Sequence, residues 1–414
     1  MTYLPLILHE TIDNLKNEKW INHLISMGNV YIVGGTVRDA FLNKPIKDID
    51  LIVENISLET IRKELSFFGK VDIVGESFSV IKFKPEDYKG EPYEIATPRM
   101  DRKVGEGHKG FEIVTEGVDI LMDLKRRDFT INSIAIDLFN ETLIDPFNGL
   151  DDLNDKNLRA TDKRAFIEDP LRMIRGIQFA SRFRFNIEES TLQMMKENCH
   201  LIEEISGERI FEEFEKIINK DGDTGLAFKL LKETQLDRTI FGKEMMGIPE
   251  DLGILDSISF YYIMALLGGV DPEYFLRVNL KANNEIIRDV ATLDKIFGYI
   301  NIVDEEEKRW RLLKDFSKAP NVRDAVILPN DIDDIVLQMR TGKIPMTMKD
   351  LRVNGNDVIT VSKETFDIDI KGTEIGRILE LLMRDALMNR FDWTSSYETF
   401  SKLCDIIYKI NNNN

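Results

Sequence analysis

The pattern of apolar and polar residues divides the chain into two parts. Over about the first 150 residues, short apolar runs that are typical of buried strands alternate with helical stretches. Beyond Asp151 the apolar residues recur every three or four positions, as on the buried face of an amphipathic helix. The pattern therefore predicts an α+β fold, with a mixed sheet first and helices after it. We expect strands at Val30 to Val33, Asp50 to Val53, Val80 to Phe83, Glu94 to Ala96 and Ile134 to Leu138, and helices at Leu171 to Phe183, Glu208 to Ile218, Leu226 to Glu233 and Glu374 to Met388.

The composition indicates a globular protein without disulfides, a zinc site or a membrane span. The 414 residues are 43% hydrophobic, which is ordinary for a globular chain of several structural units. Cys199 and Cys404 lie far apart, so neither a disulfide framework nor a zinc site is expected. No apolar run reaches the roughly 18 residues of a membrane span, and the first ten residues do not resemble a signal peptide, so we expect a cytoplasmic protein without a membrane contact. The net charge of −18 predicts that nucleic acid is contacted only through local basic patches.

Two glycines follow the first expected strand. Gly34 and Gly35 come directly after the run Val30 to Val33 and before a helix-like stretch from Thr36 to Leu42 that contains Arg38. Paired glycines let a ligand approach the backbone, and the amides at the start of a helix attract anions. The segment therefore predicts a phosphate-binding turn, to which a plain tight turn is the alternative.

Two aspartates follow this turn. Because successive side chains of a strand point to opposite faces, Asp48 and Asp50 are expected on one face, with Ile49 and Leu51 toward the core. Mg²⁺ takes oxygen ligands and usually keeps one or two protein carboxylates, so the pair predicts a magnesium site. Taken alone, such a pair is also typical of a solvated face. Glu94 is the candidate third carboxylate, and its alternative is a solvent-facing acid at the sheet edge.

Together these residues resemble the catalytic signature of the DNA polymerase beta-type nucleotidyltransferases. The longer match is to the bacterial class II group, which contains the CCA-adding tRNA nucleotidyltransferases and the bacterial poly(A) polymerases, and it continues in four further blocks to about Arg209. The resemblance implies transfer of a nucleotide from a triphosphate to a hydroxyl, with two Mg²⁺ ions and release of pyrophosphate. It also implies four parts: a nucleotidyltransferase head with the catalytic palm (1–150), a helical neck with a nucleotide-template helix (151–241), a helical body (242–345) and a helical tail that binds tRNA (346–414).

The second block runs from Lys125 to Ser133 and places three cations beside Asp128, ahead of an apolar strand. On its own it is equally compatible with a solvated turn. It resembles the class II motif that holds ribose and triphosphate. By that resemblance Arg127 would contact the triphosphate, and Asp128 and Asn132 the sugar. The Pro/Gly turn from Asp145 to Leu153 resembles the hinge between head and neck.

The fourth block contains Asp169, Pro170 and Arg172. Pro170 fits the first turn of a helix, so Asp169 is expected near the N-cap and Arg172 one turn further on the same face. A carboxylate and a guanidinium so placed match the edges of cytosine and adenine, but not those of guanine and uracil. An ordinary capping acid with a salt bridge is the alternative. By the resemblance, this helix is a protein template for the incoming base, and Arg175 orients the other two side chains.

One further segment and the positions of the histidines bear on the type of enzyme. The Gly- and Lys-rich stretch from Thr97 to Phe111 is expected to be a mobile loop, and it occupies the place of the loop linked to the switch from cytidine to adenosine addition. The sequence of this stretch is similar to that of the enterobacterial type of CCA-adding enzyme, which carries a C-terminal phosphohydrolase domain. All four histidines precede residue 201, so phosphatase activity is not expected here.

The last segments concern the helical part. Ser206 is expected to cap a helix in the final family block. Near the C-terminus, Lys349 to Val358 and Lys371 to Leu379 resemble the tail of CCA-adding enzymes without a phosphatase domain. There Lys371, Gly372 and Arg377 are candidates for an RNA-binding site, to which a surface turn is the alternative.

The main hypothesis is a CCA-adding tRNA nucleotidyltransferase that uses CTP and ATP as donors and a tRNA 3′ end as acceptor, without a nucleic-acid template. The alternatives are a bacterial-type poly(A) polymerase, an enzyme that adds only CC or only A, and an inactive tRNA-binding protein. No protein partner is evident from the sequence.

Overall fold

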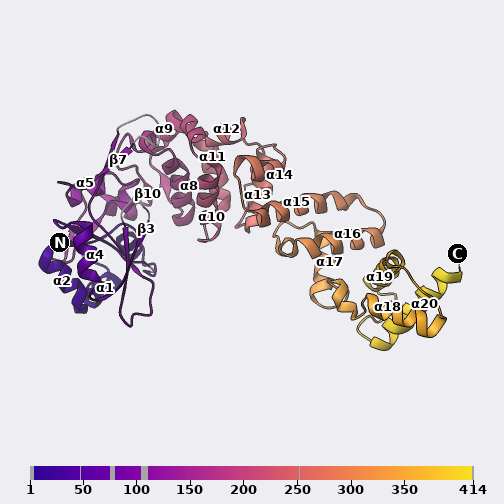
Figure 1. Ribbon diagram of the computed structural model, residues 1–414. Helices are drawn as coiled ribbons and strands as arrows, with labels where there is room; N and C mark the ends of the chain where they lie inside the picture. Colours follow the sequence, from indigo (N-terminus) through magenta and orange to yellow (C-terminus); the bar gives the residue numbers. More distant parts are fainter. Residues whose placement is uncertain (1–3, 47, 75–79, 104–110, 251, 413–414) are drawn as a thin grey trace. The chain divides into compact units, whose positions relative to one another are not determined.

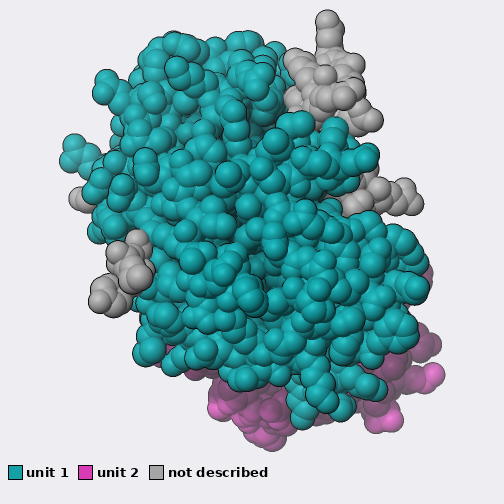
Figure 2. All heavy atoms as spheres, turned by 90° about the vertical axis from the view of Figure 1, so that its left-hand side faces the viewer, with its two compact units in different colours: residues 1–254 teal, residues 255–414 magenta. Residues whose placement is uncertain are grey.

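The computed structural model describes residues 4–412 except 47, 75–79, 104–110 and 251 (Figure 1). The chain forms two compact units, Met1–Ile254 and Leu255–Asn414, which Figure 2 colours separately. The predicted head and neck both belong to unit 1. The finer division at residues 150, 241 and 345 stays a prediction.

Unit 1 contains a seven-stranded sheet. Its order is β3-β4-β5-β2-β1-β8-β9; β2 pairs parallel with β5, and the other neighbours pair antiparallel. The strands are β1 (Asn29–Val33), β2 (Asp50–Glu54), β3 (Gly69–Val74), β4 (Val80–Pro85), β5 (Tyr93–Ala96), β8 (Ala135–Asp137) and β9 (Thr142–Ile144), with the smaller pairs β6 (Met100–Lys103) with β7 (Phe111–Val114) and β10 (Asn157–Leu158) with β11 (Asn186–Ile187). All five predicted strands are therefore confirmed within two residues at either end, and the predicted mixed sheet is confirmed.

Helices cover both faces of this sheet. On one face, Trp20 of α2 packs against Phe83 and Tyr93, with ring centroids 4.9 Å apart in each pair. On the other face, Leu124 of α5 belongs to a buried cluster with Tyr31. Because side chains alternate along a strand, the α5 face is also the one on which β2 and β5 carry their carboxylates.

The helices of unit 1 are α1 (Leu6–Asn17), α2 (Lys19–Met27), α3 (Gly35–Phe41), α4 (Leu58–Leu65), α5 (Ile120–Lys125), α6 (Gly149–Asn154), α7 (Ala165–Glu168), α8 (Leu171–Phe183), α9 (Glu189–Asn198), α10 (Gly207–Ile218), α11 (Thr224–Glu233) and α12 (Leu236–Phe241). The predicted helix from Leu171 to Phe183 has the same bounds as α8. Pro170 occupies the N-cap position of α8, and Arg184 ends the helix in the left-handed conformation. Ser206 is the N-cap residue of α10, although its side chain makes no capping hydrogen bond.

Unit 2 is helical, as predicted for this part of the chain. It contains α13 (Ser257–Leu267), α14 (Pro272–Tyr274), α15 (Asn284–Gly298), α16 (Glu305–Lys318), α17 (Asn330–Arg340), α18 (Gly355–Phe366), α19 (Gly372–Leu387) and α20 (Ser396–Asn412). Helix α15 packs on α13 and α14, and α18, α19 and α20 pack on one another. Within the described residues, no helix is both long and apolar enough to cross a membrane.

Candidate active site

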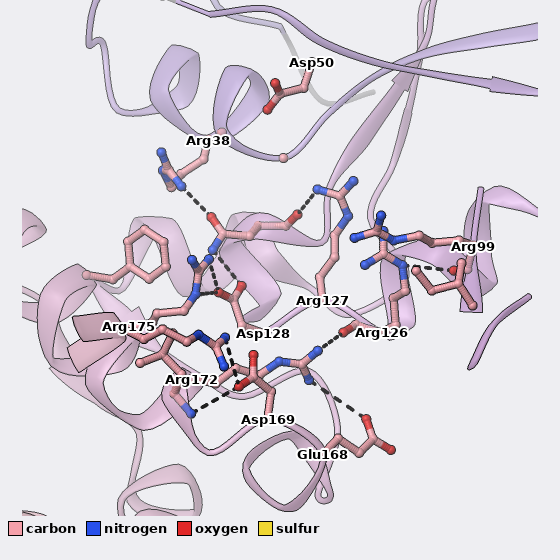
Figure 3. Close-up of a pocket in the computed structure, with 17 residues that line it drawn as sticks. Arg38, Asp50, Arg99, Arg126, Arg127, Asp128, Glu168, Asp169, Arg172 and Arg175 are labelled. Atoms are coloured by element: carbon pink, nitrogen blue, oxygen red, sulfur yellow. Dashed lines mark hydrogen bonds and ion pairs between the residues drawn. The ribbon is translucent and has the colours of Figure 1, made fainter. Parts of the chain in front are cut away.

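A cavity of about 830 Å³ lies in unit 1, where the sheet, the segment after α5 and the start of α8 meet (Figure 3). It is lined by every nucleotide-binding residue predicted from the sequence, together with Asp50. Its other lining residues are Arg99, Ile113, Arg126, Glu168, Leu171, Phe179 and Arg209. Seven arginines thus face one cavity in a chain of net charge −18, so the basic patch expected for a polyanionic ligand is here.

The glycine turn forms one wall of the cavity. Gly34 is the N-cap residue of α3 and has a φ of +63°, a backbone conformation that residues other than glycine rarely adopt. A Cβ at Gly34 would lie 2.5 Å from Nη1 of Arg127, and a Cβ at Gly35 would lie 3.5 Å from Nη2 of Arg38. Glycine is therefore required at position 34 both by the backbone conformation and by the close approach of Arg127.

A buried carboxylate holds two of the arginines. Asp123 of α5 is fully buried, and its Oδ1 accepts hydrogen bonds from Nε and Nη2 of Arg126 at 2.9 and 2.7 Å. Its Oδ2 accepts from Nε and Nη2 of Arg127 at 3.2 and 3.1 Å, and the amide of Arg99 donates to Oδ1 at 3.2 Å. Burial alone would raise the pKa of Asp123, but the charges of Arg127 and Arg126 outweigh it and hold the pKa below its usual value. Asp123 is therefore an ionised anchor for the arginines of the cavity.

A second buried network runs through Asn132. Its Nδ2 donates to Oδ1 of Asp128 at 2.9 Å, and its Oδ1 accepts from Nη1 of Arg38 at 2.5 Å. Oδ2 of Asp128 accepts from Nε and Nη2 of Arg175 at 2.9 and 2.6 Å, and Arg175 also lies 3.8 Å from Glu213. Burial would raise the pKa of Asp128, but Arg175 and Asn132 lower it below its usual value. Both oxygens of Asp128 thus already have partners within the protein.

The start of α8 carries the predicted template residues. The amide of Leu171 donates to Oδ1 of Asp169 at 3.3 Å, and that oxygen lies 3.7 Å from Nη2 of Arg209. Nη2 of Arg172 donates to the carbonyl of Arg126 at 2.7 Å. Asp169 and Arg172 both face the cavity, as Figure 3 shows. The nearest partners of Arg175 are Asp128 and Glu213, whereas the sequence led us to expect that it orients Asp169 and Arg172.

Of the two predicted metal-binding carboxylates, only Asp50 lines the cavity and lies in a strand. Asp50 is the first residue of β2 and pairs in register with Glu94 of the neighbouring β5, so the two side chains share a face. Asp48 precedes the strand and is exposed, and Ile49 is only partly buried, so the expectation that Ile49 points into the core holds only in part. Glu94 also lies 3.2 Å from the ammonium of Lys82.

The charges near Asp50 fit a divalent cation. Burial, then the charge of Glu94 and, to a smaller extent, that of Asp48, raise the pKa of Asp50 against the effect of Arg127, to about 6 in all. Among the described residues, no three His, Cys, Asp or Glu side chains come together as a ready-made metal site. Mg²⁺ needs only one or two protein carboxylates and completes its shell with water and phosphate, so the residues present are compatible with it.

Several cavity residues were not selected from the sequence as site residues. They are Asp123, which anchors the arginines, and the lining residues Arg99, Ile113, Arg126, Glu168, Leu171, Phe179 and Arg209. For Asp123 a signal exists, since it precedes Arg126 by three positions and Arg127 by four, which is the spacing of helical ion pairs.

Two other predictions concern the start of α19 and the segment from Thr97 to Phe111, of which only Arg99 lines the cavity. Lys371, Gly372 and Arg377 are exposed at the start of α19 in unit 2, and the amide of Lys371 donates to Oε2 of Glu374 at 3.0 Å. The stretch from Thr97 to Phe111, expected to be a loop, is a loop only in part, because Met100–Lys103 form β6, which pairs with β7 starting at Phe111; residues 104–110 lie outside the described residues.

Comparisons with known proteins concern the family of the chain. A family model described as "Poly A polymerase head domain" matches residues 30–159, and one described as "Probable RNA and SrmB- binding site of polymerase A" matches residues 184–246. A CCA-adding enzyme of Lactobacillus helveticus is 34% identical over 282 residues, which cover 66% of this chain and 68% of the relative. A CCA-adding enzyme of Streptococcus pyogenes serotype M2 is 31% identical over 335 residues, which cover 74% of this chain and 81% of the relative.

Solved structures show the same fold over nearly the whole chain. The CCA-adding enzyme of Bacillus stearothermophilus in complex with CTP has a TM-score of 0.72 at 24% identity and covers 99% of this chain and 100% of its own. The CCA-adding enzyme of Thermotoga maritima complexed with tRNA has a TM-score of 0.55 at 21% identity, with 96% of this chain and 98% of its own covered. From its sequence relatives and its cavity, the chain belongs to the CCA-adding enzyme family of nucleotidyltransferases.

Proposed function

We propose that this chain adds C, C and A, taken from CTP and ATP, to the 3′ end of tRNA without a nucleic-acid template and with release of pyrophosphate. The observation that carries the proposal is a single cavity in which the glycine turn, the anchored arginines and the pair Asp169 and Arg172 face one another. The proposal is supported by relatives named CCA-adding enzymes and by structural neighbours solved with CTP, ATP and tRNA.

The triphosphate is proposed to lie along the glycine turn. Gly34 and Gly35 let the phosphates approach the backbone at the start of α3, while Arg38 and Arg127 supply positive charge. Asp123 and Asn132 fix these guanidinium groups before a ligand arrives, so little side-chain entropy is lost when the triphosphate binds. The proposed sugar contacts of Asp128 and Asn132 use the lone pairs and amide hydrogens that remain beside their internal hydrogen bonds.

The base is proposed to be read by Asp169 and Arg172. The carboxylate accepts from the exocyclic amine of cytosine or adenine, and the guanidinium donates to the neighbouring ring acceptor. Arg172 is held by the carbonyl of Arg126, directly ahead of the triphosphate residue Arg127. This hydrogen bond links the residue proposed to read the base to the segment that carries the triphosphate residue. We assign Arg175 the role of positioning Asp128, to which it donates a hydrogen bond.

Asp48 and Asp50 are proposed to hold Mg²⁺, two ions in all, with Glu94 as the third carboxylate. When bound, these ions lower the pKa of the attacking 3′-hydroxyl and offset negative charge on the leaving pyrophosphate. Of these carboxylates Asp50 lines the cavity, and Glu94 shares its face of the sheet. Lys371, Gly372 and Arg377 are proposed to bind the tRNA backbone in unit 2, and the tRNA substrate places the enzyme in the cytoplasm.

Extension of a tRNA that lacks its terminal CCA tests the proposal. The full chain is incubated with CTP alone, with ATP alone and with both, and products are separated at single-nucleotide resolution. We expect two additions with CTP alone, and three with both nucleotides followed by a stop.

A second candidate is a poly(A) polymerase, because one matching family model carries that name. Unlimited adenosine addition that ignores CTP would establish it and refute the main proposal. Addition of only CC or only A would indicate a partial enzyme, and absence of extension despite tRNA binding would indicate an inactive binding protein.

A further inference from the structure

A second group of positive charges lies around the ring of Phe183, at the end of α8. The guanidinium carbon of Arg38 is 4.9 Å from the ring centroid, that of Arg182 is 4.8 Å away, and the ammonium of Lys44 is 4.6 Å away. Lys220 follows α10, and the chain just after it is tied to the end of α8, because the amide of Asp223 donates to the carbonyl of Ser181 at 3.0 Å; the charges of Arg182 and Arg38 also lower the pKa of Lys220. We call Arg38, Lys44, Arg182 and Lys220 the Phe183 cluster.

The charges of the Phe183 cluster are only partly neutralised. Asp39 serves two guanidinium groups, at 2.7 Å from Arg38 and 3.9 Å from Arg182. Within the described part of the chain, the ammonium groups of Lys44 and Lys220 form neither a hydrogen bond nor an ion pair with a side chain. The further acid that acts on Lys44 is Asp221, which is exposed. Four cations therefore face two carboxylates.

Nearby Lys216 adds a further positive charge beside Lys220, although its own ammonium is paired with Glu213 at 2.8 Å. The repulsion among these positive charges also lowers their pKa values. Burial and the charge of Arg182 lower the pKa values of Lys44 and Lys220, and burial and the charge of Arg38 lower the pKa of Arg182.

A purely structural role must be weighed against a ligand site. Three helices, α3, α8 and α10, end close to this cluster, and cations near a helix C-terminus are stabilised by the helix dipole. The face of an aromatic ring also attracts cations. If these effects were the whole reason for the cluster, removing the lysine charges would destabilise the fold. If the lysines instead await an anion, removing them would relieve repulsion.

The position of the cluster indicates which anion it takes. Arg38 lines the nucleotide cavity, so the cluster adjoins that cavity directly. Lys44, Arg182 and Lys220 do not line it, and the cavity already contains arginines and a glycine turn for a triphosphate. An acceptor RNA whose 3′ end reaches the cavity needs its own backbone phosphates neutralised just outside it.

We propose that the Phe183 cluster binds a backbone phosphate of the acceptor RNA next to its 3′ end, with Lys44 and Lys220 as the contacting cations. The inference rests on the proposed function, since it takes the acceptor to be RNA. It adds a binding site at the meeting of α3, α8 and α10, apart from the site for the incoming nucleotide.

The test uses the full-length double variant Lys44→Gln/Lys220→Gln and a charge-matched control, Lys63→Gln/Lys89→Gln, whose lysines are exposed in the sheet region of unit 1. Affinity for a tRNA ending in CC is measured over a series of salt concentrations. Each lysine that contacts a phosphate contributes about one unit to the slope of log affinity against log salt, so the cluster variant should lose roughly two units. Its KM for tRNA should rise, its KM for CTP should stay, and its Tm should be equal to or above that of the wild type.

Three outcomes overturn the inference. The first is a salt slope equal to that of the control, and the second is a rise in KM for CTP without one for tRNA, which assigns the cluster to the triphosphate. The third is a lower Tm with unchanged RNA affinity, which assigns it to the helix ends. Inorganic tripolyphosphate serves as a competitor, and we expect it to displace the nucleotide from both proteins equally.

The two proposals fail separately. If the wild type binds single-stranded RNA through the cluster but does not extend tRNA, the proposed function fails and the phosphate site stands. If the wild type adds CCA and the cluster variant keeps the wild-type slope, only the phosphate site fails.

Discussion

Replacing Asp123 by asparagine removes a buried negative charge that holds two arginines of the cavity. The side chain of Asp123 is 0% exposed, and it accepts five hydrogen bonds, from Arg126, Arg127 and the amide of Arg99. Asparagine keeps the shape but offers one acceptor oxygen, and it turns an NH₂ group toward one of the guanidinium groups. The variant thus leaves two cations without their counter-charge.

The expected cost follows from this burial. Removing one partner of a buried ion pair typically costs about 3–5 kcal/mol, because the other charge stays buried. The side chains of Arg126 and Arg127 are 19% and 18% exposed and regain some hydration by turning outward, so we expect about 2–4 kcal/mol. If Arg127 leaves its place, one charged hydrogen bond to the triphosphate is also lost. At roughly 1.5–3 kcal/mol this lowers kcat/KM for CTP about 10- to 100-fold.

Urea unfolding and steady-state kinetics measure the two effects. Asp119→Asn is the matched control, since it removes the same charge from the N-cap of the same helix and asparagine still caps it. The folded pKa of Asp123 lies below its unfolded value, so its contribution to stability is present above about pH 4 and is lost as the pH falls through the folded pKa. The difference between the wild type and Asp123→Asn should therefore shrink below about pH 4. A variant as stable and as active as the Asp119→Asn control at pH 7 would refute the anchoring role of Asp123.

Three further predictions concern the walls of the cavity. Gly34→Ala places alanine at a positive φ and displaces Arg127, so the free energy of unfolding in urea should fall by about 1–3 kcal/mol and turnover should fall as well. Gly117→Ala, at φ +71° with open space around it, measures the cost of the positive φ alone. Equal losses in the two variants would exclude the contact with Arg127. Burial and neighbouring acids raise the pKa of Asp50 to about 6, so Asp50→Asn in EDTA at pH 8 should stabilise the fold by about 1–2 kcal/mol, allowing for its partial exposure, and this gain should vanish toward pH 4. The same variant should lose nucleotide transfer and keep its tRNA affinity. Destabilisation at pH 8 would contradict the electrostatic argument. Asp169→Ala removes the acceptor for the exocyclic amine, so GTP and UTP misincorporation should rise relative to the wild type, and unaltered selectivity would remove the residue from base recognition.

Local patterns were sufficient for much of the fold. The bounds of α8 follow from Pro170, which fixes the start, and from apolar spacing that ends at Phe183. The central strands follow from short apolar runs. Strand β3 was not predicted, because its sequence Gly-Lys-Val-Asp-Ile-Val reads as half polar, and it forms an edge strand that pairs with β4 alone. Its pairing therefore depends on a neighbour that the local sequence does not reveal.

The sequence by itself determined which functional groups Gly34, Asp50, Arg127 and Asp169 contribute and in which local structure they lie, because turn glycines, strand alternation and helix caps act over a few residues. Only the tertiary structure decided which of these groups meet. The sheet brings Asp50 beside Glu94 from a distant strand, and α8 brings Arg172 against the carbonyl of Arg126. Such contacts depend on how buried apolar faces pack between elements far apart in the chain, and no local spacing encodes them. For the same reason, the cations of the Phe183 cluster, which come from the ends of α3, α8 and α10, are brought together only when the chain has folded.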